Sequence, residues 1–144
     1  MPQSHFRKLE AMYHAAPINQ WFLPRLHIPE AGSAELSLAV RPDFFHAAGA
    51  LHGSVYFKAL DDATFFAVQS LITETFALTV SFNLYFLRPV QDGTLTARGR
   101  VVSRSKRLFI AEGTLFDARG KEAARGSGTF MPSATPLGEN IGYR

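Results

Sequence analysis

One uninterrupted stretch, from Ser54 to Ile72, constrains the fold more than any other part of the chain. It contains neither glycine nor proline, and it is long enough for about five turns of helix at ~3.6 residues per turn. Most of its side chains are apolar, as expected of a helix that other structure surrounds. We therefore predict one long central helix, from about Gly53 to Ile72, around which the rest of the chain is arranged.

The polar exceptions in this helix fall on one stripe. Lys58, Asp61 and Asp62 follow i, i+3, i+4 spacing, and Gln69 lies on the same side. A buried carboxylate is costly unless it is paired, so at least one aspartate needs a reason to be there. Lys58 offers Asp62 an i, i+4 partner, which leaves Asp61 as the better candidate for a nucleophile or general base. The alternative is that both aspartates face solvent or a subunit contact.

Apolar patterns before the central helix predict three segments. A short helix within residues 1–17 can be capped by Ser4 and ends before Pro17, because the residue before a proline avoids the helical region. Residues 18–28 read as irregular. Alternating apolar residues then predict a strand over 34–40, which leads up to the central helix.

The clearest strand signal follows the central helix. Apolar residues at Phe76, Leu78 and Val80 continue with a period of two to Phe86, which predicts that this face of the strand covers the helix. Three further strands are expected, at residues 94–102, 107–116 and 122–131. Residues 132–144 are rich in proline, glycine and serine and are expected to form a loose tail.

Short turns join the later strands, and short turns imply antiparallel hairpins. We therefore predict a single α+β domain over residues 1–144, with an antiparallel sheet wrapped around one long helix. The edges of such a sheet usually pair with a second copy, so a homo-oligomer is expected.

Composition excludes several classes of protein. The chain has 144 residues, of which 47% are hydrophobic and 19% charged, and this argues against disorder. It has no cysteine, which removes disulfides, thiolate nucleophiles and cysteine-based metal sites. His46 and His52 lack a third ligand at a recognisable spacing, so no metal site is expected. The absence of a signal sequence and of an apolar run near ~20 residues favours a cytoplasmic protein without a membrane span.

Gly53 stands where the central helix begins, and a backbone N–H at that position has no partner within the helix. With the helix dipole, it can stabilise a carbonyl oxygen as negative charge develops there. The alternative is an ordinary glycine at a helix start. Gly53 and Asp61 are about 12 Å apart along the helix axis. If both act on one carbonyl, they come from two chains with antiparallel central helices, and function requires a dimer.

Basic side chains gather at one predicted strand and the turn after it: Arg98, Arg100, Arg104, Lys106 and Arg107. A solvated face is the simpler interpretation, and a landing site for ligand phosphates is the functional alternative. The net charge of +3 mildly favours an anionic ligand. No aromatic residues interleave with these charges as base stacking would need, so nucleic acid is not expected as a partner.

Several motifs together carry a resemblance to a known family. They are Gly49-Ala-Leu-His-Gly-Ser54, an aspartate nine residues after the histidine (Asp61), Phe82-Asn-Leu-Tyr-Phe-Leu-Arg-Pro89, and Ala124-Arg-Gly-Ser-Gly-Thr-Phe130. From about Pro42 to Phe130 the chain resembles hotdog-fold acyl-CoA thioesterases of the PaaI-like (phenylacetate-degradation) type. The resemblance implies a sheet that wraps a central helix, and active sites between the subunits of a dimer or a larger oligomer.

The resemblance also implies roles for single residues. Gly53 would give the oxyanion N–H, and Asp61 of the facing subunit would act as nucleophile or base. Thr79 would help to place the water, although strand alternation puts it opposite Leu78, away from the face expected to cover the helix. From the residues alone, His52 is expected to orient the turn or touch substrate. Residues near the turn 103–107 would bind coenzyme A phosphates: Arg104, Lys106 and Arg107.

The chain departs from the family pattern at three positions, each a candidate for substrate binding. Ser54 replaces the second glycine of the usual His-Gly-Gly, and its backbone N–H remains. His46 replaces an asparagine that is expected to position substrate or water. Asp62 is an unusual second aspartate.

The expected reaction is hydrolysis of an acyl-CoA thioester to a free acid and coenzyme A, with no cofactor beyond the coenzyme A of the substrate. Four aromatic residues are candidates for an acyl pocket, with core packing as the alternative: Tyr56, Phe57, Phe65 and Phe66. Two other functions stay open, a non-catalytic module that binds acyl-CoA or fatty acid, and a hotdog dehydratase or hydratase. The latter would need His46 or His52 near Asp61 of the partner chain.

Overall fold

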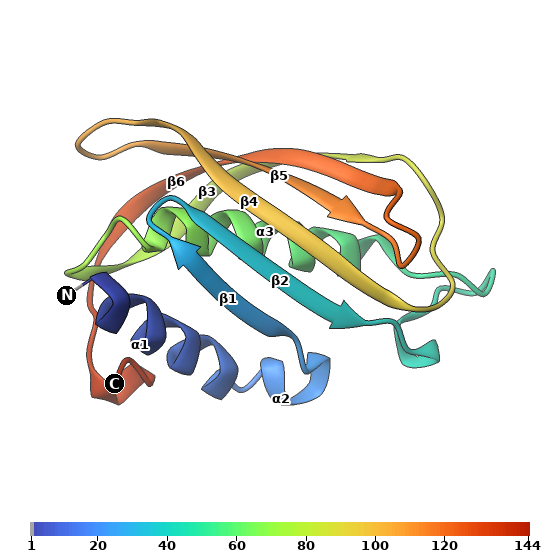
Figure 1. The fold of residues 1–144 in the computed structure, drawn as a ribbon, viewed down its shortest axis with the longest axis horizontal. Coiled ribbons are helices and arrows are strands. Elements are labelled where there is room, and N and C mark those ends of the chain that lie inside the picture. The colour runs from blue at the N-terminus through green and yellow to red at the C-terminus, as the bar shows by residue number, and fades with distance from the viewer. Residues whose placement is uncertain (1) are drawn as a thin grey trace.

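The computed structural model describes residues 2–144 (Figure 1). Two helices, α1 (Pro2–Ala15) and α2 (Asn19–Phe22), precede a sheet. Its strands are β1 (Arg25–Glu30), β2 (Ser33–Ala39), β3 (Thr75–Phe86), β4 (Thr94–Arg104), β5 (Phe109–Phe116) and β6 (Glu122–Pro136). The long helix α3 (Gly53–Gln69) lies between β2 and β3 in the chain, and short 3-10 turns occur at η1 (Pro42–Phe44) and η2 (Glu139–Ile141).

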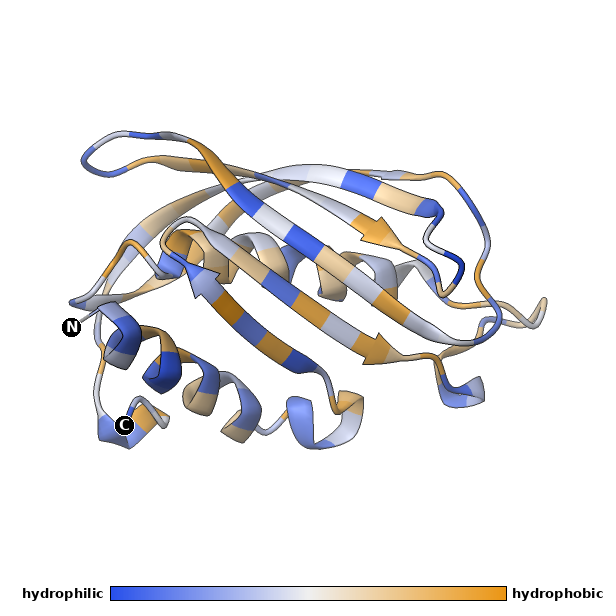
Figure 2. Cartoon of the chain, viewed as in Figure 1, coloured by the Kyte–Doolittle hydropathy of each residue, from blue (hydrophilic) through white to orange (hydrophobic). Residues whose placement is uncertain are grey.

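The sheet is antiparallel throughout, with the strand order β1-β2-β4-β5-β6-β3. It curves around α3, while α1 and the C-terminal segment lie on the side that the sheet leaves open (Figure 1). Apolar and polar residues alternate along β1, β2 and β4, so each strand turns one face to the core (Figure 2). The expected hotdog fold, an antiparallel sheet wrapped around one long helix, is confirmed.

Two glycines let the sheet approach α3 closely. Gly99 of β4 and Gly113 of β5 are paired across the sheet. A Cβ atom at Gly99 would lie 2.5 Å from the carbonyl oxygen of Ala63, and one at Gly113 would lie 2.9 Å from the Cγ2 atom of Thr64. A larger residue at either position would push the helix away from the sheet. The glycines therefore fix the depth at which the site helix lies.

The helix ends three residues earlier than expected, and Gln69 is the reason. Its side chain is fully buried, donates to the carbonyl oxygens of Ile72 and Thr75 at 3.0 and 2.9 Å, and accepts from the N–H of Ala77 at 2.8 Å. Gln69 therefore closes the helix and starts β3 instead of extending the polar stripe. Among residues 2–144, no helix is both long and apolar enough to cross a membrane.

The N-terminal region differs from the sequence-based expectation in two ways. The first helix already begins at Pro2, so Ser4 lies inside α1 and does not cap it. Residues 18–28, expected to be irregular, instead contain α2 and the first four residues of the edge strand β1. Pro29 obscured this strand, but an edge position tolerates a proline because one side of the strand makes no ladder hydrogen bonds.

A bulge in β3 reverses the predicted face of this strand only for residues 77–80, because Phe76, Phe82 and Leu84 pack against the core as predicted. The register with β6 shifts between Thr79 and Ser81, which leaves Val80 without a partner in β6. Before the bulge, Ala77 is fully buried whereas Leu78 is 54% exposed. The prediction that Leu78 and Val80 cover the helix is therefore wrong, and Thr79 faces inward instead. Bulges re-aim side chains in this way and are common next to active sites.

The C-terminal segment is not the loose tail that its composition suggested. Strand β6 continues to Pro136, and η2 follows. Leu137, Ile141 and Tyr143 are half-buried and pack against the core. The hydroxyl of Tyr143 lies 2.8 Å from Nδ1 of the buried His5.

Candidate active site

Asp61 lies at the middle of α3 and is hydrogen-bonded to β3. The Thr79 hydroxyl donates to Asp61 Oδ1 at 2.9 Å, and the bulge after Thr79 makes this contact possible. Burial raises the pKa of Asp61 to about 6, the Thr79 hydrogen bond lowers it, Asp62 raises it, and Lys58 lowers it. Near neutral pH the group is therefore a carboxylate that still has an appreciable affinity for a proton, as a general base requires.

Asp62 has different surroundings from those of its neighbour. Its Oδ2 atom accepts from the Lys58 ammonium at 2.8 Å and from the Tyr13 hydroxyl at 2.6 Å. The predicted i, i+4 pair is thus present, and the tyrosine of α1 is a partner that sequence reasoning missed. Burial and the negative charge of Asp62 raise the pKa of Tyr13, which keeps it a donor. Asp62 is a paired carboxylate, and Asp61 is the one held by a single neutral hydroxyl.

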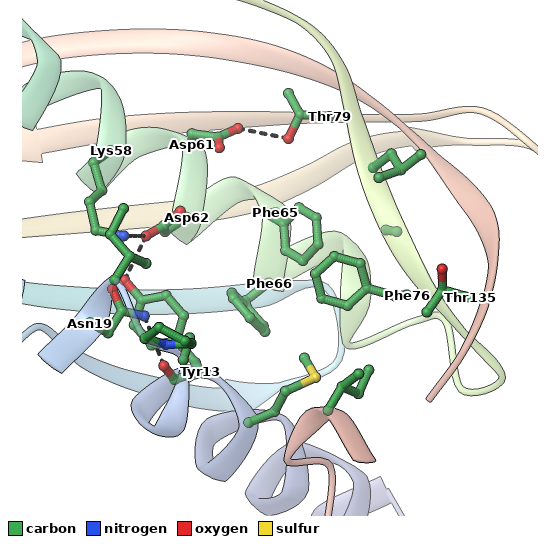
Figure 3. A pocket seen from close by; sticks show the side chains of 17 residues that line it. Tyr13, Asn19, Lys58, Asp61, Asp62, Phe65, Phe66, Phe76, Thr79 and Thr135 are labelled. Atoms are coloured by element: carbon green, nitrogen blue, oxygen red, sulfur yellow. Dashed lines mark hydrogen bonds and ion pairs between the residues drawn. The ribbon is translucent and has the colours of Figure 1, made fainter. Parts of the chain in front are cut away.

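A cavity of about 690 Å³ opens beside these two carboxylates. Its lining is mainly apolar and includes the rings of Phe65, Phe66 and Phe76, with Asp61 and Thr79 at its edge (Figure 3). Apolar cavities with few polar groups are typical of small-molecule sites. The further lining residues come from α1, the segment after it, β3 and the C-terminal segment: Met12, Tyr13, Ala16, Pro17, Ile18, Asn19, Lys58, Asp62, Ala77, Leu78, Thr135 and Ile141.

Two of the four aromatic residues predicted for an acyl pocket line this cavity, and two do not. Phe65 and Phe66 do so. Tyr56 instead donates its hydroxyl to the carbonyl of Arg88 at 2.7 Å, and the Phe57 ring packs edge-on against Phe82. Sequence reasoning missed the walls given by α1 and by the C-terminal segment, because these are non-local contacts.

The N-terminal turn of α3 forms a second group of predicted site residues. His52 is its N-cap: its Nδ1 atom accepts from the backbone N–H of Ser54 at 3.0 Å and lies 2.8 Å from the Ser54 hydroxyl. The Gly53 N–H has no hydrogen-bond partner among residues 2–144. This turn is on the surface, where both His52 and Ser54 are exposed.

His46 lies in the loop that precedes this turn. Its Nδ1 atom accepts from the N–H of Ala48 at 3.1 Å, and its backbone carbonyl accepts from the N–H of Gly49. Gly49 has a φ of 81°, which favours glycine. The structure therefore places His46 and His52 in their own turns, and neither bonds to Asp61 within the described chain.

The predicted phosphate-binding residues lie on the hairpin between β4 and β5, which projects beyond the sheet in Figure 1. Arg104, Lys106 and Arg107 are all exposed, and none of them lines the cavity. Within residues 2–144 none of the three makes a salt bridge. In that part of the chain there is also no group of three or more His, Asp or Glu side chains able to hold a metal ion.

Comparison with known proteins shows the family to which the chain is similar. A family model described as the thioesterase superfamily matches residues 48–124, which include the N-terminal turn of α3, Asp61 and Thr79. A relative from Saccharolobus solfataricus, provisionally named as an esterase, is 30% identical over 102 residues, or 71% of this chain and 68% of the relative.

Two solved structures are also similar. The PaaI protein of E. coli, from the phenylacetic acid degradation operon, superposes with a TM-score of 0.86 at 20% identity, covering 95% of this chain and 99% of that one. A phenylacetic acid degradation-related protein from Ralstonia eutropha, provisionally assigned as a thioesterase, has a TM-score of 0.77 at 26% identity, over 88% and 98% of the two chains. At 20% identity, the likeness to the E. coli protein shows the shared fold.

Proposed function

Because the chain belongs to the thioesterase superfamily, we propose that it hydrolyses acyl-CoA thioesters to free acid and coenzyme A at a site shared between two subunits. Family membership supports thioester hydrolysis in general. The acyl-CoA substrate, the shared site and the roles below are the specific content of the proposal.

The environment of Asp61 is the observation that supports the proposal most strongly. Its carboxylate lies at the edge of an apolar cavity, is oriented by one hydroxyl, and has a pKa of about 6 because it is buried. In an acyl-CoA complex the acyl group occupies the cavity, and the thioester carbonyl lies beside Asp61. The carboxylate then acts on the carbonyl carbon, either directly or through a water molecule.

In the water route, Asp61 takes a proton from water while the water oxygen bonds to the carbonyl carbon. The carbonyl oxygen becomes an oxyanion, and the N–H of the partner's Gly53 stabilises it. Collapse of the tetrahedral intermediate breaks the C–S bond, and the proton held by Asp61 goes to the leaving thiolate. In the direct route, Asp61 bonds to the carbonyl carbon, the thiolate leaves, and water hydrolyses the resulting anhydride. Thr79 orients the carboxylate in both routes.

Distance supports the proposed dimer. Gly53 is the first residue of α3 and Asp61 lies at its middle, so the two are about 12 Å apart along the helix axis. To act on one substrate, both must lie about 3 Å from the reacting group. Strand β3 forms one edge of the sheet and exposes Leu78 and Val80, which are 54% and 56% exposed. An apolar edge strand of this kind suits contact with a second copy.

The remaining predicted residues take binding roles in this proposal. Arg104, Lys106 and Arg107 meet the phosphates of coenzyme A from the exposed end of the β4–β5 hairpin. His52 and Ser54 fix the turn that presents Gly53, and His46 lies in the loop before that turn. Asp62 shapes the cavity wall through Lys58. We propose no cofactor beyond the coenzyme A of the substrate.

The test is free-thiol release from a panel of short, long and aryl acyl-CoAs by wild type and by the Asp61→Asn variant. We expect Asp61→Asn to lower turnover by about 10²- to 10⁴-fold. Asp62→Asn is the matched control, because it makes the same change one residue away at a carboxylate that already has two partners. We expect it to lose no more than about tenfold.

Three outcomes would contradict the proposal. Equal losses in the two variants would show that charge in the helix matters rather than Asp61 itself. Acyl-CoA binding without turnover in wild type would favour the non-catalytic module. A modified acyl chain without thiol release would indicate a dehydratase or hydratase, for which His46 or His52 of one chain would have to approach Asp61 of the other.

A further inference from the structure

The C-terminal segment, residues 137–143, closes the side of the cavity that lies away from Asp61. Ile141 of η2 lines the cavity together with Met12 of α1. In Figure 3 the pair Asp61–Thr79 is at the top of the cavity, α1 and the C-terminal turn are at the bottom, and phenylalanine rings lie between them. An acyl chain whose carbonyl is at Asp61 therefore extends towards this segment.

Specific contacts hold the segment in place. The N–H of Leu137 donates to the carbonyl of Glu74 at 3.0 Å, and the Tyr143 hydroxyl lies 2.8 Å from Nδ1 of His5. Gly142 has a φ of 90°, and a Cβ atom there would be only 3.4 Å from the α1 backbone. The segment is thus anchored on both sides of Ile141, and its turn is pressed against α1. It forms a positioned wall.

We propose that Ile141 is a specificity-determining residue, and that it limits the length of the acyl group that the cavity accepts. This inference rests on the proposed function and names its substrate range. A fixed wall at the end of an apolar cavity discriminates against one extra methylene by about 10- to 200-fold. Shortening the wall by the three side-chain carbons that separate isoleucine from alanine makes room for a longer chain.

The experiment compares kcat/KM against acyl-CoA chain length for wild type and Ile141→Ala. We expect the longest accepted acyl group to gain about two carbons, with kcat/KM for that substrate raised by about tenfold. Leu137→Ala is the matched control, because Leu137 lies in the same segment and packs against the core but does not line the cavity. It should keep the wild-type length profile. A wild-type profile in Ile141→Ala would overturn the inference.

A second readout needs no turnover. Calorimetric binding of saturated fatty acids of increasing length should show the same shift in Ile141→Ala. A shifted binding limit without any thiol release would refute the proposed hydrolysis and leave the wall assignment standing. Hydrolysis with an unchanged limit would do the reverse. If Ile141→Ala does not fold, Ile141→Val decides: it removes one carbon of the wall and should lengthen the longest accepted acyl group by about one carbon, and an unchanged limit would overturn the inference.

Discussion

The N-terminal turn of α3 and the middle of the same helix have contrasting environments. At the turn, His52 and Ser54 are exposed and bonded to each other, and the Gly53 N–H has no partner among residues 2–144. At the middle, Asp61 lies beside an apolar cavity and accepts from Thr79. One region offers a donor and the other a base, about 12 Å apart along the axis. In the proposed function each chain therefore carries two half-sites, and two chains complete one site.

After Asp61→Asn, the largest effect should come from removing the donor at the turn. Proline at the first helical position fits the backbone there and has no N–H, so Gly53→Pro keeps α3 and removes the proposed oxyanion donor. We expect kcat for thiol release to fall by about 10²- to 10³-fold. Steady-state kinetics with unchanged helix content by circular dichroism is the check.

Gly53→Ala is the matched control, because it adds a Cβ atom and keeps the N–H. That atom would lie 3.1 Å from the Phe86 ring, and Phe86 is 58% exposed and able to shift. We expect Gly53→Ala to retain at least about a tenth of wild-type activity. Equal losses in both variants would mean that crowding at Phe86, rather than the missing N–H, explains the defect.

The next effect concerns the orientation of the base. Thr79→Val keeps the shape of the side chain and removes the hydroxyl that donates to Asp61. We expect about a tenfold loss of kcat. Activity depends on the carboxylate form, so it rises with pH through the pKa of Asp61, about 6 in wild type. Loss of a hydrogen bond that lowers this pKa must move the acid limb of the profile to higher pH. An acid limb at the wild-type pH would show that Thr79 does not influence the pKa of Asp61.

A smaller effect is expected on stability. Because the folded-state pKa of Asp61 is raised from 3.8 to about 6, the native state holds the proton more tightly than the unfolded state does. The contribution of protonated Asp61 to the free energy of unfolding is therefore complete below pH 3.8, and it is lost as the pH rises through about 6. Asp61→Asn removes the buried charge, so it should raise the free energy of unfolding by up to about 3 kcal/mol at pH 8. Urea unfolding at pH 4 and pH 8 is the measurement, and the gain should vanish at pH 4.

The smallest effect should lie outside both half-sites, on the β4–β5 hairpin. Replacing Arg104, Lys106 and Arg107 together by alanine should raise KM for acyl-CoA by about three- to tenfold at low salt and leave kcat unchanged. The difference should shrink as salt is added. Replacing three exposed basic residues outside the hairpin, Arg25, Arg119 and Lys121, is the control for the same change in net charge. The same KM change in both variants would argue against a phosphate site on the hairpin.

The features of the fold and of the site that could be predicted from the sequence are those that depend on local patterns. The length of α3, the separation of Gly53 from Asp61 and the pairing of Lys58 with Asp62 depend on helix geometry alone, so spacing was sufficient. The late strands were also predicted, because alternation and turn residues are local signals.

The rest depends on contacts between distant segments. The bulge that turns Thr79 towards Asp61 is a feature of the pairing with β6, and the strict alternation of β3 concealed it. The Tyr13 hydroxyl reaches Asp62 from another helix, and Ile141 reaches the cavity from a segment of low hydrophobicity. Most residues that line the cavity were therefore not predicted from the sequence, whereas the carboxylate of Asp61 at its edge was predicted.

Mixing two inactive variants tests the shared site most directly. In a dimer of Gly53→Pro with Asp61→Asn, one of the two interfacial sites has both an intact N–H and an intact carboxylate. Refolding the two variants together at equal concentrations should restore about a quarter of wild-type thiol release, since about half of the dimers are mixed and each has one good site. Each variant refolded alone should stay inactive. No recovery in the mixture, with mixed dimers demonstrated by mass, would contradict a site shared between two chains.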